Sequence, residues 1–231
     1  AENLAKAGEE RVDLLLLVGE EAGSDGARAA NRLSPTSKHL VNGEPTESKL
    51  ANGAKGSLRA TLRFRGRAAH SAYAELGKSA IVPMVKLMGT IDSLKLPSDR
   101  TLGKTTVNIG TIRAGTAGNI VPELAETELM FRLVGDVAKV KKALEKWVGK
   151  KAEIEYGSHI PAQKFETIPG FAVTPVAYTT DIPLLSRWGR PLLFGPGSIH
   201  VAHTPDEYVE LDELRRSVGS YEHIVRTLLK S

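Results

Sequence analysis

Two adjacent glutamates, Glu20 and Glu21, follow an apolar run in the stretch LLLLVGEEAGSDGA, residues 14–27. Like charges side by side repel one another, and burying them beside an apolar strand adds a desolvation cost. We therefore expect the pair either in a solvated turn, where it interacts with the N-terminal end of a following helix, or beside a cation that compensates both charges. This stretch alone leaves both interpretations open.

Three further features could act together with this pair. Glu44 lies in NGEPT, where the following proline makes the turn rigid. His203 lies in AHTPDE, shortly after FGPGS, where Gly195 and Gly197 allow the backbone to approach a substrate carboxylate closely. Each feature also has an ordinary explanation, namely a surface glutamate, a structural histidine and a tight turn.

The elements that position these residues follow from hydrophobic patterning. Residues 12–18 predict a fully buried strand, Ser24 is a suitable N-cap for a short helix, and HLVNG (39–43) predicts a second strand. Strand, helix and strand in this order favour a mostly parallel sheet flanked by helices, with chemistry at the carboxyl ends of its strands. The paired glutamates and Glu44 stand at such ends.

From Gly56 onward the pattern changes to the alternation of half-exposed strands. Helices and strands then follow in the order β-α-β-β-α-β, which is typical of a ferredoxin-like α+β domain. The predicted elements after the first strand are a helix at 79–94, strands at 105–113 and 125–133, a lysine-rich helix within 139–151 and a strand at 152–157.

We therefore predict an inserted domain over 55–160 within a larger α/β domain that is made of two pieces, 1–54 and 161–231. The second piece contributes short strands at 175–181 and 191–197 and a helix at 211–229.

Composition excludes several classes of protein. The chain has 231 residues and 25% charged residues, and no apolar run approaches the roughly 18 residues of a membrane helix. The net charge is +4, but the lysines of 139–151 alternate with apolar residues at helical spacing, so we expect no nucleic-acid partner. Cysteine is absent, which leaves His, Asp and Glu as strong metal ligands and favours a cytoplasmic location.

Four motifs in order, GEEAGSDGA, NGEPT, GRAAHSA with GNIVPELAETELMFR, and FGPGSIHVAHTPDEY, resemble one family. It is the family of two-metal amidohydrolases and exopeptidases that includes acetylornithine deacetylase, succinyl-diaminopimelate desuccinylase, aminoacylase and carboxypeptidase G. The resemblance spans nearly the whole chain. It implies a zinc-exopeptidase-like catalytic domain with an inserted dimerisation and lid domain.

The resemblance also implies roles for the residues of the larger domain. Glu20 would be the general base, and Glu21 and His203 would share one metal ion while Glu44 binds the other. Zinc is the expected metal, two ions per complete subunit, although cobalt or manganese would also suit these ligands. Asp181, in TTDIP, would be a substrate-side or structural acid and is not counted among the ligands.

Three residues of the inserted domain receive roles from the same resemblance. His70 would reach the active site of a second subunit of a homodimer and stabilise the oxyanion. Asn119 and Arg132 would hold the carboxylate or acyl group of the substrate, Arg132 by a forked pairing. The ordinary alternatives are a turn residue for Asn119 and a surface strand charge for Arg132.

One part of the family pattern is missing from the sequence. The resemblance implies a His-x-Asp motif and a bridging aspartate ahead of the paired glutamates, but the 19 residues before Glu20 contain no histidine and a single aspartate, Asp13. We expect this fragment alone to lack a complete two-metal site.

The predicted function is hydrolysis of the amide bond of an N-acyl amino acid by a metal-activated water. The alternatives are a metallo-exopeptidase acting on short peptides, or an inactive dimerisation or binding module.

Overall fold

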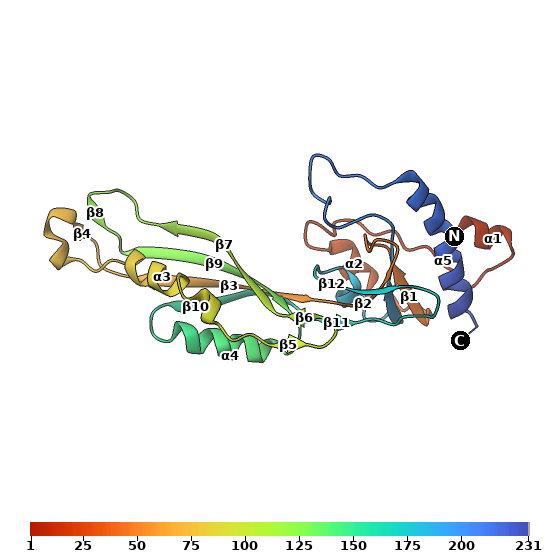
Figure 1. The fold of residues 1–231 in the computed structure, drawn as a ribbon, viewed down its shortest axis with the longest axis horizontal. Helices are drawn as coiled ribbons and strands as arrows, with labels where there is room; N and C mark the ends of the chain where they lie inside the picture. Colours follow the sequence, from red (N-terminus) through yellow and green to blue (C-terminus); the bar gives the residue numbers. More distant parts are fainter. Residues whose placement is uncertain (231) are drawn as a thin grey trace. The chain divides into compact units, whose positions relative to one another are not determined.

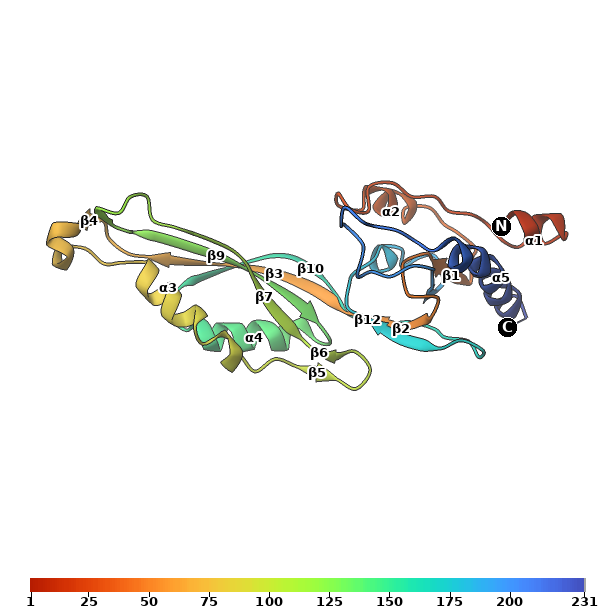
Figure 2. The same cartoon turned by 45° about the horizontal axis from the view of Figure 1, so that its top comes forward.

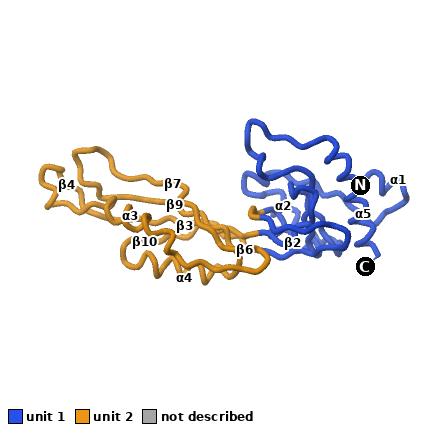
Figure 3. Tube along the Cα trace, viewed as in Figure 1, with its two compact units in different colours: residues 1–54, 163–176, 180–231 blue, residues 55–162, 177–179 orange. Residues whose placement is uncertain are grey.

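The computed structural model describes residues 1–230, and its backbone divides into two compact units (Figure 3). Unit 1 consists of Ala1–Ala54, Gln163–Val176 and the chain from Thr180 onward. Unit 2 consists of Lys55–Ala162 and Ala177–Thr179. No helix in the described part of the chain is both long enough and apolar enough to cross a membrane.

Unit 2 is built on a four-stranded antiparallel sheet with the order β10-β3-β9-β7, and two helices cover one of its faces (Figures 1 and 2). This arrangement confirms the predicted ferredoxin-like order. The main elements are β3 (Gly56–Arg65), α3 (Ile81–Met88), β7 (Thr106–Ala114), β9 (Leu124–Leu133), α4 (Val137–Val148) and β10 (Glu153–Ile160).

The small elements of unit 2 lie around this sheet. Strand β4 pairs antiparallel with β8, and β5 pairs antiparallel with β6. Helix α3 is shorter than the predicted 79–94, since it ends before Gly89 and a 3₁₀ turn follows. The small elements are β4 (Ala69–His70), η1 (Ser71–Leu76), η2 (Ile91–Ser93), β5 (Ser98–Asp99), β6 (Gly103–Lys104) and β8 (Ile120–Val121).

Alternation along the strands builds the core of unit 2. Every second residue of β9 from Ala125 to Leu133 is buried, and α4 presents Val140, Leu144 and Val148 to the same core at helical spacing. The Asp136 side chain caps α4 by accepting a hydrogen bond from the Ala138 amide at 2.8 Å.

Two arginines of β3, Arg63 and Arg65, are paired with carboxylates of neighbouring strands. Arg63 contacts Glu126 at 2.7 Å and Glu155 at 2.6 Å, and Arg65 contacts Glu153 at 2.8 Å. These ion pairs neutralise arginine charge that could otherwise contact the phosphates of a nucleic acid.

Unit 1 contains a five-stranded sheet in which β1 pairs parallel with β13 and β12 pairs parallel with β2, whereas β11 and β13 pair antiparallel with β2. The sheet is therefore mixed, and the predicted mostly parallel sheet is not confirmed. The strands are β1 (His39–Asn42), β2 (Leu50–Ala54), β11 (Gln163–Lys164), β12 (Val173–Val176) and β13 (Arg190–Leu193), and the helices are α1 (Glu2–Lys6), α2 (Asp25–Ala30), η3 (Ile182–Leu184) and α5 (Leu211–Leu228).

Strand β2 explains part of this difference. It follows the Glu44 turn and pairs with β11, β12 and β13, so it ties the two pieces of unit 1 together. No strand is assigned to this segment from the sequence, and its Asn52-Gly53 is a typical turn sequence. The pairing with three neighbouring strands outweighs that local preference.

The predicted buried strand over 12–18 is wrong. The segment is assigned to no strand, and Leu14, Leu16 and Val18 are 69%, 80% and 75% exposed. Leu15 and Leu17 point the other way and pack on the small cluster of Ala27, Ala30 and Leu185. A strand is stable when its backbone pairs with a neighbour, and the described fold places no strand beside this segment, so one side of it remains exposed.

Candidate functional site

Glu21 and His203 come from distant parts of the chain and meet in unit 1. Glu21 lies in the turn before α2, and His203 lies in the loop between β13 and α5. His203 Nε2 and Glu21 Oε1 are 3.6 Å apart, and both side chains are mostly exposed. Two ligands of one tetrahedral zinc ion lie about 3.4 Å apart when each bond is about 2.0–2.1 Å long. The pair is therefore spaced as two ligands of one metal ion would be.

Glu20 lies beside this pair in an acidic environment. Partial desolvation raises its pKa, the carboxylates of Glu21 and Asp181 raise it further, and His203 lowers it. A carboxylate with a raised pKa is a better proton acceptor than a fully solvated one, which is the property that a general base needs.

Glu44 follows β1 and is partly buried. Burial raises the pKa of Glu44 to about 7, with further contributions from the negative charges of Glu20, Asp181 and Glu21, while the nearby side chain of Asn42 lowers it. The structure thus brings Glu20, Glu21, Glu44 and His203 into one electrostatic group and adds Asp181 to it.

The turn that holds Glu44 is fixed on the loop that contains Gly195 and Gly197. The Thr46 amide donates to the Gly195 carbonyl at 3.1 Å, and the Glu47 amide donates to the Gly197 carbonyl at 2.8 Å. The buried Thr46 hydroxyl accepts from the Gly195 amide at 3.0 Å and donates to the Lys49 carbonyl at 2.6 Å. A Cβ atom at Gly195 would lie 2.4 Å from the Glu44 carbonyl oxygen, so the close approach of the two segments requires glycine there.

Backbone strain is concentrated around the same group. Within residues 1–230, the non-glycine residues with positive φ are Ser24 at 60°, Glu47 at 55°, Ser48 at 56° and His203 at 61°. Each is a predicted ligand or lies within four positions of a predicted site residue in the sequence. Such conformations cost free energy and cluster at functional sites.

The donors in unit 1 suit a divalent cation in kind, because carboxylate oxygens and an imidazole nitrogen are ligands of zinc, cobalt and manganese. One buried carboxylate oxygen, Asp181 Oδ1, has no hydrogen-bond partner among the described residues. In the described part of the chain, however, no three His, Asp or Glu side chains are arranged so that they could hold a metal ion. The donors of the group thus fit a divalent cation in kind, and Glu21 and His203 stand at ligand spacing, but the described residues do not form a complete metal site.

In unit 2 the structure brings two of the three predicted residues together. His70 pairs with Ile120 through β4 and β8, and the Ser71 amide donates to the Asn119 carbonyl at 2.9 Å. The exposed His70 ring accepts from the Ala72 amide at 3.2 Å through Nδ1. Its Nε2 atom is thereby left as the nitrogen that can carry a proton and donate to a substrate.

Arg132 lies apart from His70 and Asn119. It stands near the far end of β9, paired with Ser57 and Thr106, whereas β4 and β8 lie near the Leu124 end of that strand. Arg132 lies eight steps along the strand from Leu124, which corresponds to about 26 Å. Within one copy of unit 2, Arg132 therefore does not act on the same group as His70.

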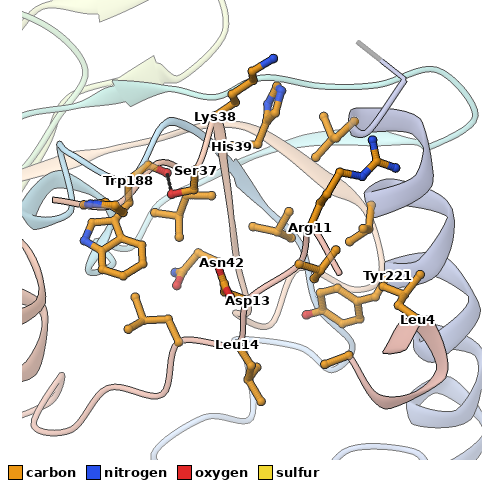
Figure 4. A pocket seen from close by; sticks show the side chains of 18 of the residues that line it. Leu4, Arg11, Asp13, Leu14, Ser37, Lys38, His39, Asn42, Trp188 and Tyr221 are labelled. Atoms are coloured by element: carbon orange, nitrogen blue, oxygen red, sulfur yellow. Dashed lines mark hydrogen bonds between the residues drawn. The ribbon is translucent and has the colours of Figure 1, made fainter. Parts of the chain in front are cut away.

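A large cavity of unit 1 does not contain the candidate site. It has a volume of about 1510 Å³ and is lined by the segment Glu10–Leu15 and Leu17, by β1 and by one side of α5 (Figure 4). In Figure 4, Asp13 and Asn42 lie toward its middle, with Trp188 and Tyr221 at opposite sides. None of the predicted site residues lines it.

Comparisons with known proteins identify similar chains and folds. Residues 52–155 match the family model of the peptidase dimerisation domain of M20 peptidases. The chain is 37% identical over 224 residues to a peptidase M20 domain-containing protein of Schizosaccharomyces pombe, which covers 95% of this chain and 56% of that protein. It is 36% identical over 247 residues to a probable carboxypeptidase of Aspergillus flavus, covering 94% of this chain and 57% of the relative.

A solved structure shares the fold. An M20 family metallo-carboxypeptidase from Sulfolobus solfataricus superposes with a TM-score of 0.63 at 19% identity, covering 85% of this chain and 65% of that one. The chain thus spans a little more than half the length of the curated relatives that it matches. The matched dimerisation domain and the named relatives show that this chain is similar to M20 peptidases over nearly its whole length.

Proposed function

We propose that the protein containing this chain is a metal-dependent hydrolase that cleaves an amide bond next to a free carboxylate. The proposal rests on one observation above all, the 3.6 Å separation of His203 Nε2 and Glu21 Oε1 beside Glu20 and Glu44. The M20 relatives and their carboxypeptidase names support the same reaction class.

The residues of this chain would contribute to the reaction as follows. Glu21 and His203 would hold one metal ion, and Glu44 would bind the second. A bound divalent cation supplies positive charge that lowers the pKa of a water molecule and polarises the substrate carbonyl. Zinc is the proposed metal, two ions per complete subunit, and cobalt or manganese would suit the same donors.

Glu20 would act as the general base. Its carboxylate would accept a proton from the attacking water and pass that proton to the amine that leaves. Partial desolvation, followed by the neighbouring Glu21 and Asp181 charges, raises its affinity for this proton, which makes it a better acceptor. Gly195 and Gly197 would let the backbone approach the substrate carboxylate closely. The roles of His70 and Asn119 in oxyanion and substrate binding, and of Arg132 in substrate binding, stay predictions.

Two substrate classes fit this chemistry. The relatives named as probable carboxypeptidases favour short peptides with a free carboxyl end. The N-acyl amino acids of the sequence prediction present the same amide bond and carboxylate. Parallel assays of dipeptides, N-acetylornithine and N-succinyl-diaminopimelate on the intact protein separate the two classes, and we expect hydrolysis within this set.

We further propose that the protein forms a homodimer through unit 2 and acts in the cytoplasm. The matched family model describes a dimerisation domain. Helix α3 buries Met84, Leu87 and Met88 against the sheet while it exposes Val82 and Val85 on its other side, at 51% and 59%. Strand β7 is an edge strand and leaves backbone groups available for pairing.

Substitution of the general base tests the mechanism. Glu20→Ala in the intact protein should lower kcat by at least about 10²-fold, because proton transfer loses its acceptor, while the metal content is retained. Activity assays and metal analysis of the same samples measure both properties. Glu10→Gln, at another exposed glutamate, is the control. Unchanged turnover in Glu20→Ala would contradict the assignment of Glu20, and a protein without bound metal would contradict the hydrolase itself.

A further inference from the structure

Asp181 is a buried carboxylate that the proposed reaction does not yet explain. It is 4% exposed and lies at the end of the loop before η3. Its Oδ1 atom is fully buried and has no hydrogen-bond partner in the described part of the chain. The neighbouring Thr180, equally buried, has its hydroxyl satisfied by the Ile182 amide at 3.2 Å.

A capping role does not account for this side chain. Asp181 stands at the N-cap position of η3, where aspartate commonly accepts a backbone hydrogen bond, but its side chain makes no such bond. A buried carboxylate without hydrogen bonds or a cation costs several kcal/mol. The described residues supply no such partner to Oδ1, so the position needs one from outside them.

The surroundings of Asp181 indicate the charge of that partner. The negative charge of Asp181 affects the carboxylates of both Glu20 and Glu44. The negative charge of Glu21 affects the same two carboxylates. His203 is the group of opposite charge that acts on Glu20, and it is paired with Glu21. A bound anion would add to the repulsion among these carboxylates, and an apolar ligand would leave their charge uncompensated. A divalent cation would compensate it.

We propose that the unpartnered oxygen of Asp181 faces the divalent cation held by this group, and that Asp181 supplies charge for binding it. The family resemblance alone makes Asp181 a substrate-side or structural acid, and its burial with an orphaned oxygen is the observation that changes its role. The inference rests on the proposed metal-dependent function, which it extends by one residue.

Thermal unfolding with and without metal tests the proposal. The intact wild-type protein and Asp181→Asn are unfolded in excess chelator and in excess Zn²⁺, and Zn²⁺ affinity is measured by competition with a chromophoric chelator. We expect Asp181→Asn to bind Zn²⁺ at least tenfold more weakly and to lose most of the Zn²⁺-induced rise in Tm. Its Tm in chelator should equal or exceed that of the wild type, because an unpartnered charge has been removed. Asp92→Asn, at an exposed aspartate of unit 2, is the matched control.

Each outcome decides the question. If Asp181→Asn lowered Tm equally in chelator and in Zn²⁺ and bound Zn²⁺ as tightly as the wild type, the role of Asp181 would be merely structural. That result would overturn the proposal for Asp181 and leave the metal centre unaffected. No Zn²⁺-induced rise in the wild type would overturn the metal centre and with it this role. If Asp181→Asn does not fold, Asp181→Ser, which is smaller and also uncharged, replaces it. Its Zn²⁺ affinity and its Zn²⁺-induced change in Tm then decide the question.

Discussion

Glu44 shows how strongly the acidic side chains of unit 1 affect one another. Its pKa of about 7 reflects burial first and the charges of Glu20, Asp181 and Glu21 second. At neutral pH a group with this pKa is close to half protonated, and a metal ligand must lose its proton to bind. Metal affinity at Glu44 should therefore rise with pH through about 7.

The same pKa predicts a pH-dependent cost in stability. Because the pKa of Glu44 is raised from 4.5 to about 7, its contribution to stability is fully present below pH 4.5 and is lost as the pH rises to about 7. Glu44→Gln should therefore be more stable than the wild type by about 1–2 kcal/mol at pH 8 in chelator, a figure reduced for solvent screening, and equal to it near pH 4.5.

Urea denaturation at the two pH values measures this difference in free energy of unfolding. Glu10→Gln serves as control, because Glu10 is exposed and its substitution should leave the pH dependence unchanged. A stability difference for Glu44→Gln that is the same at pH 4.5 and pH 8 would contradict the proposed charge crowding.

Among the elements, the turn after β1 and the loop after β13 form one structural support. Hydrogen bonds of the Thr46, Glu47 and Ser48 amides to the carbonyls of Gly195 and Gly197 join the two segments at 2.8–3.1 Å. Glu44 sits at the start of this turn, so its position depends on the loop as much as on β1. Gly195 and Gly197 thus have a structural reason to be glycine in addition to the predicted contact with substrate.

Gly195→Ala tests this support. The new Cβ atom would meet the Glu44 carbonyl oxygen at 2.4 Å, and the atoms that it would meet belong to the backbone, so no flexible side chain could yield. We expect a loss of stability of about 1–3 kcal/mol, as for other overpacked sites, and weaker Zn²⁺ binding because Glu44 is displaced. Chemical denaturation and metal titration measure the two effects.

Gly219→Ala is the matched control for this experiment. Gly219 lies in α5 with open space where a Cβ atom would stand, so alanine there should raise stability by up to about 1 kcal/mol through helix propensity. If Gly195→Ala were as stable as the wild type and bound Zn²⁺ equally well, the turn and loop would not position Glu44.

At the scale of the whole chain, each unit has its own hydrophobic core. The core of unit 2 is formed by β3, β9, α3 and α4, and that of unit 1 by β2, β13 and α5. Unit 2 additionally presents the exposed valines of α3 and the free edge of β7, which are the features that a symmetric interface can bury.

Val85→Asp tests the proposed dimer. A charge on the exposed side of α3 would have to be buried in the interface without a partner, so we expect mainly monomers at concentrations where the wild type is dimeric. Light scattering coupled to size-exclusion chromatography measures the mass. Val173→Asp, the same substitution at 53% exposure in unit 1, should leave the mass unchanged. Dimers of unaltered mass in Val85→Asp would exclude this side of α3 from the interface.

Sequence patterning predicts the elements whose apolar residues recur with a clear helical or strand period. The lysine-rich helix α4, the long helix α5 and the alternating strands β3 and β9 all occur near their predicted positions, because their burial pattern is repeated over two or more turns or many strand residues. The mixed sheet of unit 1 is not predicted, because strands of four or five residues carry too little pattern to reveal their direction or neighbours.

The sequence by itself determined the ferredoxin-like order of unit 2 and identified the acidic pair, Glu44 and His203 as candidates, since residue type and motif order are local properties. Tertiary structure decided which of them meet. It placed His203 against Glu21, separated Arg132 from His70 along β9, and left Leu14 and Leu16 exposed where a buried strand was predicted. It also buried Asp181 without a partner for one oxygen among the described residues. Contacts between residues far apart in the chain, and the desolvation that they cause, depend on packing and not on any single segment.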